Sequence, residues 1–173
     1  MKYYAGIGSR ETPPEILNYF TLLAKYLAKH KYVLRSGGAR GADKAFEAGC
    51  DAANGQKEIY LPWKGFEGSD SPLIVSDPNA FIIASKYHPK WMSLSAGAKK
   101  LQARNTHQVL GWDLNTPSDF IICWTRNGSG AGGTGQTIRI AEAYNIPVFD
   151  TGKYRSIDDI KVAIKKFLAG KVI

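Results

Sequence analysis

Residues 32–47 read YVLRSGGARGADKAFE, and this stretch decides the fold. An aromatic and β-branched run ends at a Gly-Gly turn, and Ala42, Ala45, Phe46 and Gly49 then recur at helical spacing. The pattern predicts a strand, a glycine turn and the start of a helix. Such glycines let the backbone approach a ligand, and the first N–H groups of the helix suit a phosphate. We interpret the turn as a candidate anion site, while a turn that only connects strand and helix is equally consistent with this stretch alone.

Two more glycine turns follow strand-like runs. Residues 6–10 read GIGSR, and residues 128–137 read GSGAGGTGQT. Three such turns, each behind a strand and in front of a helix, gather at the carboxyl edge of a parallel sheet, where open α/β sheets bind ligands. We therefore expect Gly8, Gly37 and Gly133 to lie together at one edge of a sheet.

The rest of the chain alternates strand and helix patterns. Thr12 has the pattern of a helix N-cap, with Pro13 at the first helical position. The expected elements are strands at 2–7, 32–36, 57–61, 120–124 and 146–149, and helices from Pro13 to about His30, from Ala42, from Ser95, over 137–144, and from a Ser156 cap to about Leu168. Alternating strands and helices predict an α/β fold: a single Rossmann-like three-layer domain over residues 1–173, with a mainly parallel sheet of about five strands.

The segment 62–89 has the weakest pattern of the chain. Trp63 and Phe66 stand among glycine, serine and proline, which favours an irregular loop with exposed aromatic side chains. Within it, residues 79–83 read NAFII and are the candidate for a short extra strand. We expect the loop to act as a lid or as a subunit contact.

The composition of the chain gives only general indications of function. The 173 residues include 23 Lys and Arg against 15 Asp and Glu, a formal net charge of +8 that suits a polyanion or a phosphorylated ligand. No apolar run approaches the roughly 18 residues that span a bilayer, and a strand pattern begins almost at once, so we expect a cytoplasmic protein with no membrane partner. Cys50 and Cys123 lack CxxC spacing and a nearby His, so we expect reduced thiols and no metal site.

Two familiar nucleotide motifs are absent. The first turn lacks the third glycine of GxGxxG, and the strand before Gly37 ends in Ser36 where a dinucleotide fold places an acidic residue. The third turn lacks the GK[ST] of a P-loop. The sequence therefore predicts neither an NAD site nor an NTPase, and we expect no cofactor.

Four motifs occur in a recognisable order. They are GIGSR (6–10), SGGARGAD (36–43), ARN (103–105) and GTGQT (133–137), followed by IPVF (146–149). In these motifs the chain resembles the Rossmann-like core of the DprA/Smf DNA-processing proteins. That family belongs to the SLOG superfamily, which also includes the LOG nucleotide phosphoribohydrolases and nucleotide-signal sensors. The resemblance runs from about Tyr3 to Phe149, and the LPWKGF and RNTHQVLG segments are similar to those of small phage-encoded DprA-like proteins. It implies a homo-oligomer.

The chain departs from both families. It has no room for the additional domains of full-length DprA-type proteins. The catalytic glutamate of the LOG segment PGGxGTxxE falls on Arg139, and Arg104 matches the assisting arginine. Glu47 and Glu142 are the remaining candidates for a substitute acid. We therefore expect a protein that leans toward binding without catalysis, and we assign no catalytic residue.

Three functions remain open. The first is non-catalytic binding of a nucleotide or a nucleotide-derived signal, such as a cyclic or ADP-ribose-type nucleotide. The second is DprA-like binding of single-stranded DNA, with Trp63, Phe66 or Trp91 as stacking surfaces. The third is a LOG-like phosphoribohydrolase.

Under the first reading, phosphates lie on the glycine turns, Ser9 and Arg10 reach the ligand, and Trp124 lies near a base. The candidate ligand-binding residues are Gly8, Ser9, Arg10, Ser36, Gly37, Gly38, Ala39, Asp43, Arg104, Asn105, Trp124, Gly132, Gly133, Thr134, Gly135, Gln136 and Thr137.

Structural alternatives stay open for several of these side chains. Arg10 and Arg104 could form ion pairs with Asp43 or Glu47, because charged residues at an empty site often pair with one another. Trp124 ends an apolar strand and could belong to the core.

Overall fold

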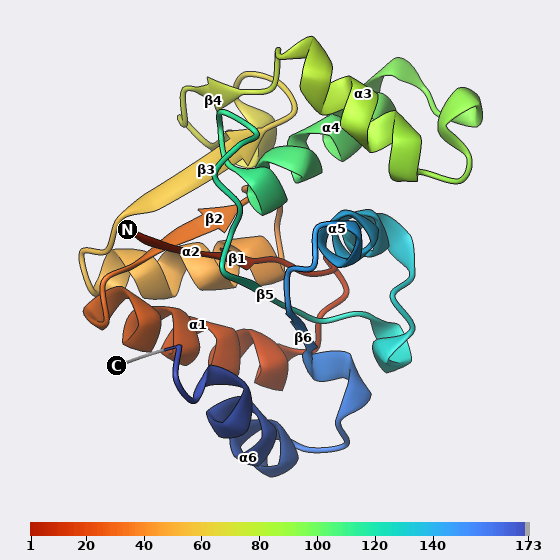
Figure 1. Cartoon of the computed structure of the whole chain (residues 1–173). Coiled ribbons are helices and arrows are strands. Elements are labelled where there is room, and N and C mark those ends of the chain that lie inside the picture. The colour runs from red at the N-terminus through yellow and green to blue at the C-terminus, as the bar shows by residue number, and fades with distance from the viewer. Residues whose placement is uncertain (172–173) are drawn as a thin grey trace.

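The computed structural model describes residues 1–171 and shows a parallel sheet with helices on both faces (Figure 1). The six strands run in the order β4-β3-β2-β1-β5-β6, and every neighbouring pair is parallel. The strands are β1 Lys2–Gly6, β2 Tyr32–Ser36, β3 Lys57–Leu61, β4 Leu73–Ile74, β5 Phe120–Cys123 and β6 Val148–Asp150. The helices are α1 Pro14–Lys29, α2 Ala42–Ala52, α3 Pro78–Tyr87, α4 Ala96–Leu110, α5 Gly132–Ala143 and α6 Ile157–Leu168. The predicted three-layer α/β fold is confirmed.

The two faces of the sheet carry separate cores. Helices α1, α2 and α6 cover one face, and α4 and α5 cover the other, with α3 packed outside α4 (Figure 1). Strand β1 contributes to both cores. Tyr4 packs in the core on the side of α1, and Ala5 packs in the core on the side of α4. The predicted buried stripe of α1 is confirmed: Ile16, Phe20, Leu23 and Leu27 are all buried.

The strand order brings the three glycine turns to one edge. Strand β1 lies between β2 and β5, and the turns follow these three strands. Tyr4 is in register with both Leu34 and Phe120, so the strands end at similar heights. From β1, the strands β2, β3 and β4 follow on one side of the sheet, and β5 and β6 follow on the other. At such a topological switch point, parallel sheets open a crevice for ligands.

Several predicted elements are corrected by the structure. The sheet has six strands because Leu73–Ile74 pairs with the end of β3. Helix α1 begins at Pro14 with Pro13 as its N-cap residue, and Thr12 does not cap it because its hydroxyl donates to the Ser9 carbonyl at 2.6 Å. Strand β6 covers 148–150 instead of 146–149. Pro147 has no N–H to donate to the ladder, so the strand starts behind it.

The expected extra strand at 79–83 is wrong, because these residues lie in helix α3. Asp77 caps this helix by accepting from the Asn79 N–H at 2.9 Å, and Pro78 occupies its first position. These start signals outweigh the strand preference of the apolar run that follows. Ala80 and Ala84, one turn apart, are buried against α4.

Helix α5 begins at Gly132, five residues before the predicted start at Thr137. The glycine-rich segment therefore forms the first helical turn instead of a loop in front of the helix. Gly135 needs to be glycine, because a Cβ there would collide with the Gly130 carbonyl oxygen. The preceding loop packs closely against the helix at this position. This packing explains why glycine, which disfavours helix formation, stands at position 135.

Candidate ligand-binding cleft

A cleft of about 930 Å³ lies at the glycine-turn edge of the sheet, within the range typical of small-molecule sites. It is built from the turn after β1, the start of α2, the loop after β3, one face of α4 and the start of α5. Eleven of the predicted ligand-binding residues line it: Gly8, Ser9, Arg10, Ala39, Asp43, Arg104, Asn105, Gly132, Gly133, Thr134 and Thr137.

Six other predicted residues, all within the described chain, lie outside the lining of the cleft: Ser36, Gly37, Gly38, Trp124, Gly135 and Gln136. The Ser36 hydroxyl donates to the Gly6 carbonyl at 2.6 Å, and the Gln136 amide donates to the Ala84 carbonyl at 2.9 Å. Trp124 is buried in the core on the face of the sheet that α1, α2 and α6 cover, as its structural alternative predicted. These side chains hold the fold together behind the cleft.

The second glycine turn does not offer the predicted phosphate cradle. Asp43, in the first turn of α2, turns its carboxylate back onto it, and Oδ2 accepts from the Ala39 N–H at 3.2 Å. A phosphate placed at Gly37 and Gly38 would meet this carboxylate. Burial raises the pKa of Asp43 to about 6, although the Arg104 guanidinium and the Ala39 N–H lower it. The group remains charged at neutral pH.

Helix α4 connects the second and third glycine turns through two adjacent residues. Arg104 donates to the carbonyl oxygens of Gly37 and Tyr60, and its Nε donates to Asn105 Oδ1 at 2.9 Å. Asn105 in turn donates from Nδ2 to the Gly133 carbonyl at 3.3 Å. One helix therefore sets the spacing between the two turns.

Three polar side chains, which we call the inner wall of the cleft, have donor or acceptor atoms that can form further hydrogen bonds. Asp43, Arg104 and Gln108 are only 5%, 6% and 2% exposed. Within residues 1–171, neither Arg104 Nη2 nor the side-chain amide of Gln108 has a hydrogen-bond partner. A carboxylate accepts up to about four hydrogen bonds, so Asp43 can accept another besides those from the Ala39 N–H, the Gly8 N–H and the Ser36 side chain. None of these free atoms is sealed inside the protein; they open onto the cleft, where a polar ligand can bond them.

The start of α5 supplies donors for an anion. Its N-cap residue Ala131 makes no side-chain cap, and the first turn holds no acidic residue. Gly132, Gly133 and Thr134 form this turn and line the cleft. Free N–H groups and the positive end of the helix dipole suit a phosphate at this position.

The loop in front of α5 is shaped by residues that sequence reasoning missed. Thr125 donates from its N–H to Asp150 Oδ1 at 3.0 Å and from its hydroxyl to the same carboxylate. The Thr125 oxygen also accepts from the Gly130 N–H at 3.0 Å. The signal was the acidic residue directly after the predicted strand 146–149; Asp150 is the last residue of β6, and its carboxylate reaches the end of the neighbouring strand.

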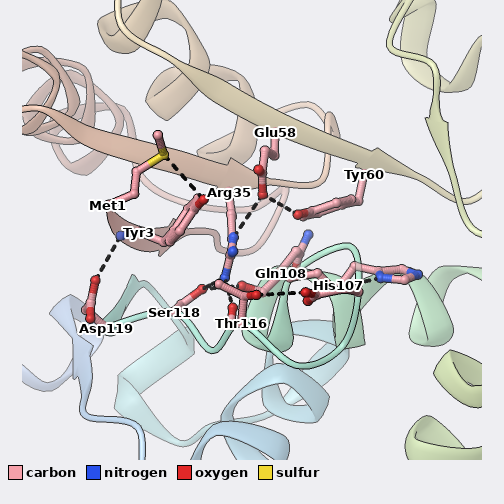
Figure 2. Close-up of polar contacts among 12 residues, drawn as sticks. Met1, Tyr3, Arg35, Glu58, Tyr60, His107, Gln108, Thr116, Ser118 and Asp119 are labelled. Carbon is pink, nitrogen blue, oxygen red and sulfur yellow. Dashed lines mark hydrogen bonds and ion pairs between the residues drawn. The ribbon is translucent and has the colours of Figure 1, made fainter.

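A second missed network supports the end of α4, on the face of the sheet that α4 covers (Figure 2). Arg35 is fully buried and donates to Glu58 Oε1 at 3.0 Å and to Ser118 Oγ at 3.1 Å. Ser118 Oγ donates to the backbone carbonyl of Gln108 at 2.7 Å. The single charge within the apolar run YVLRS was the sequence signal. The network fixes the last turn of the helix that carries Gln108 into the cleft.

Two aromatic rings from the loop after β3 form the outer wall. Trp63 and Phe66 are perpendicular, with ring centroids 5.4 Å apart, and Trp63 is 41% exposed. The Arg104 Cζ lies 5.4 Å from the Phe66 ring centroid. Trp91, the third predicted stacking residue, lies apart from the cleft lining, with Lys99 over its ring. The loop thus contributes to the same site as the glycine turns.

Arg104, the match for the assisting arginine of the hydrolases, lines the cleft, but the candidate acids and the residue at the expected glutamate position lie elsewhere. Arg139 donates to the Tyr87 carbonyl at 2.9 Å, and Glu47 pairs with Lys57 at 2.8 Å. Neither they nor the exposed Glu142 line the cleft. The predicted ion pairs of Arg10 and Arg104 with Asp43 or Glu47 are not formed among residues 1–171. The carboxylates that do line the cleft are Glu11, Asp43 and Glu67.

Comparisons with known proteins agree with the fold. No protein-family model and no curated protein matches the chain. It is similar to DNA processing protein A from Helicobacter pylori, which binds single-stranded DNA, with a TM-score of 0.58 and 24% identity. The match covers 86% of this chain and 64% of that one, so the chain spans just under two thirds of its length. It is also similar to the structural-genomics target TM1055, with a TM-score of 0.54, 21% identity, and 86% and 72% of the two chains covered.

A lower TM-score of 0.44 relates the chain to the molybdenum cofactor carrier protein from Chlamydomonas reinhardtii, at 17% identity over 98% and 99% of the two chains. The two higher scores show a shared Rossmann-like fold, which supports the DprA-like resemblance of the motifs at the level of fold. The likeness to phage-encoded proteins stays a prediction.

Over residues 1–171, no helix combines the length and the apolar character needed to cross a membrane. The same part of the chain holds no group of three or more His, Cys, Asp or Glu side chains placed to bind a metal ion.

Proposed function

We propose that the chain binds a phosphorylated nucleoside in the cleft without turning it over. The observation that carries this proposal is the inner wall of Asp43, Arg104 and Gln108, which keep unused bonding capacity beside the uncapped start of α5. A phosphate fits at Gly132–Thr134, and polar groups of the nucleoside fit the inner wall. Trp63 and Phe66 offer apolar surface to a base.

Binding without turnover is favoured by the placement of charge. Cleavage of an N-glycosidic bond needs a carboxylate near the developing positive charge of the sugar. Arg139, at the position expected for that acid, binds the Tyr87 carbonyl instead. Asp43 is held by the Ala39 N–H and lies beside a guanidinium, which opposes a second positive centre.

The experiment is recovery of the ligand after incubation. Purified protein is incubated with nucleoside 5′-monophosphates and with cyclic and ADP-ribose-type nucleotides, then heat-denatured, and the released compounds are identified by mass spectrometry. Intact ligand in stoichiometric amount supports the proposal, and Arg10→Ala should reduce its capture. Free base that accumulates over many turnovers, and is lost in Asp43→Asn, would show instead that the protein is a hydrolase.

Binding of single-stranded DNA is the second candidate, favoured by the exposed Trp63 at the outer wall and by the net charge of +8. The fold shared with a DNA-binding protein is consistent with it. Such binding should tolerate any sequence and weaken steeply with salt, because phosphate neutralisation releases counterions. Titration of labelled oligonucleotides at two salt concentrations tests this, and binding that ignores salt would exclude it.

Other parts of the proposal concern the state of the protein. We propose a single domain over residues 1–173 that works in the cytoplasm, needs no added cofactor and assembles as a homo-oligomer. Light scattering coupled to size-exclusion chromatography measures the assembly directly. A monomer at every concentration would remove the homo-oligomer from the proposal and leave the cleft unaffected.

A further inference from the structure

Asp43 is the one carboxylate on the inner wall of the cleft, among the residues that the structure describes. Oδ2 accepts from the Ala39 N–H at 3.2 Å, and the Ser36 side chain and the Gly8 N–H also lie within hydrogen-bonding reach of the carboxylate and lower its pKa. The Ser36 hydroxyl gives its own proton to the Gly6 carbonyl. Asp43 therefore has acceptor capacity left for a ligand that enters the cleft.

Arg104 presents the opposite chemistry beside it. Its Nη1 and Nε are bonded to carbonyl and amide oxygens of the protein, and Nη2 is left without a partner within residues 1–171. Both side chains line the cleft, and the Arg104 charge is near enough to lower the pKa of Asp43. The inner wall thus offers an anionic acceptor next to a cationic donor.

A hydroxyl group satisfies this pair better than the other polar groups of a nucleotide. It donates its proton to a carboxylate and accepts from a guanidinium at the same oxygen. A phosphate would be repelled by Asp43, and an exocyclic amine can donate to Asp43 but gives Arg104 no acceptor. The sugar hydroxyls are therefore the matching groups.

The position of the phosphate agrees with this assignment. Asn105 bonds the Gly133 carbonyl, and the adjacent Arg104 bonds Asn105 and the Gly37 carbonyl. If the phosphate of a ligand lies at the start of α5, the group attached to the phosphate lies next to α4 and near Asp43. In a nucleoside monophosphate, the sugar is the group directly attached to the phosphate.

We propose, on the basis of the proposed function, that Asp43 and Arg104 bind the 2′- and 3′-hydroxyls of a ribose, so that the cleft selects ribonucleotide monomers. Internal nucleotides of single-stranded DNA have no 2′-hydroxyl, and their 3′-oxygen is esterified. Asp43 and Arg104 therefore disfavour single-stranded DNA, which the aromatic rings of Trp63 and Phe66 alone would accept.

The test compares matched ligands on matched variants by calorimetric titration at about pH 8, where Asp43 is ionised. The ligands are the four ribonucleoside 5′-monophosphates and their 2′,3′-dideoxy counterparts. The wild-type protein should bind at least one ribonucleotide about tenfold or more tightly than its dideoxy counterpart, because a hydrogen bond to a charged group is lost. In Asp43→Ala the preference for the ribonucleotide should fall several-fold, because Arg104 alone remains to bond the hydroxyls.

The control is Glu47→Gln, which changes a carboxylate of the same helix that pairs with Lys57 outside the cleft. It should keep the preference for ribose. Equal binding of ribo- and dideoxynucleotides by the wild type, or a preference that Asp43→Ala leaves unchanged, would overturn the inference and leave the proposed function standing. Binding of none of these nucleotides would overturn both. Circular dichroism confirms that each variant is folded before its affinity is interpreted.

Discussion

The Asn105 side chain donates to the Gly133 carbonyl oxygen across 3.3 Å and ties the middle of α4 to the first turn of α5. Arg104, one residue earlier, makes the corresponding bond to the Gly37 carbonyl. Two consecutive residues of one helix thus hold two glycine turns that are far apart in sequence.

Asn105→Ala should loosen the start of α5. One hydrogen bond to a part-buried carbonyl is lost, so the free energy of unfolding should fall by about 1 kcal/mol. Nucleotide affinity should fall as well, because the donors of the first turn are less well fixed. Urea denaturation and calorimetric titration measure the two effects. Asn18→Ala, on the exposed face of α1, is the control and should change neither, whereas an unchanged affinity in Asn105→Ala would separate the contact from the site.

Gly133→Asp should separate binding from stability. The site of a new Cβ is open, with its nearest neighbour, Gln102 Nε2, at 4.0 Å, so the fold should tolerate the side chain. A carboxylate at a helix start stabilises the helix by about 0.3 to 1 kcal/mol, while it repels a phosphate at the same donors. We expect an equal or higher melting temperature and loss of nucleotide binding. Gly133→Ala is the uncharged control, and if both variants bind equally well the phosphate does not lie at α5.

The pH dependence of stability should report the burial of Asp43. Its pKa is about 6 in the folded protein against an ordinary value of 3.8, so the folded state binds the proton more tightly than the unfolded state. The contribution of Asp43 to stability therefore falls as pH rises from about 4 to about 6 and is constant above that range.

Asp43→Asn removes this titration and keeps an acceptor for the Ala39 N–H. The difference in unfolding free energy between variant and wild type should grow over the same pH range, to about 2 to 3 kcal/mol in favour of the variant. Urea denaturation at a series of pH values measures it. A difference that does not change with pH would show that Asp43 titrates near its ordinary value in the folded protein.

The fold was predictable because its signals are local. The strand that begins at Tyr32, the glycine turn and the start of α2 each carry a local signal, and these signals indicate the same βα unit. The buried stripe of α1 follows the helical period. Residues 79–83 show where this fails. Their apolar run suggested a strand, and only the Asp77-Pro78 start signal in front of it indicated the helix.

The site was predictable in outline and not in its chemistry. The order of the glycine turns pointed to Gly8 and Gly133, and the family resemblance of the ARN segment pointed to Arg104; all three line the cleft. The sequence could not show that Asp43 folds back onto the second turn, since this depends on the side-chain rotamer at the start of α2. Nor could it show that Gln136 faces α3 or that Gln108 faces the cleft, because the two helix faces become distinct only after α3 packs against α4 and α5.

Arg35→Met should destabilise the protein although it lies outside the cleft. The substitution leaves Glu58, Ser118 and the Thr116 carbonyl without their buried donor. Glu58 is partly exposed and can be hydrated, so we expect a loss of about 2 to 4 kcal/mol in unfolding free energy. Arg155→Met, on the surface, is the control. A loss no larger than that of the control would show that the network shown in Figure 2 contributes little to the fold.

The most direct test of nucleotide binding in the cleft is one calorimetric titration of the wild-type protein with nucleoside 5′-monophosphates, run beside Gly133→Asp. The account predicts saturable binding of at least one monophosphate at one site per chain, abolished in Gly133→Asp, with the intact nucleotide recovered afterwards. Absence of heat for every monophosphate, or binding that Gly133→Asp leaves unchanged, would contradict it.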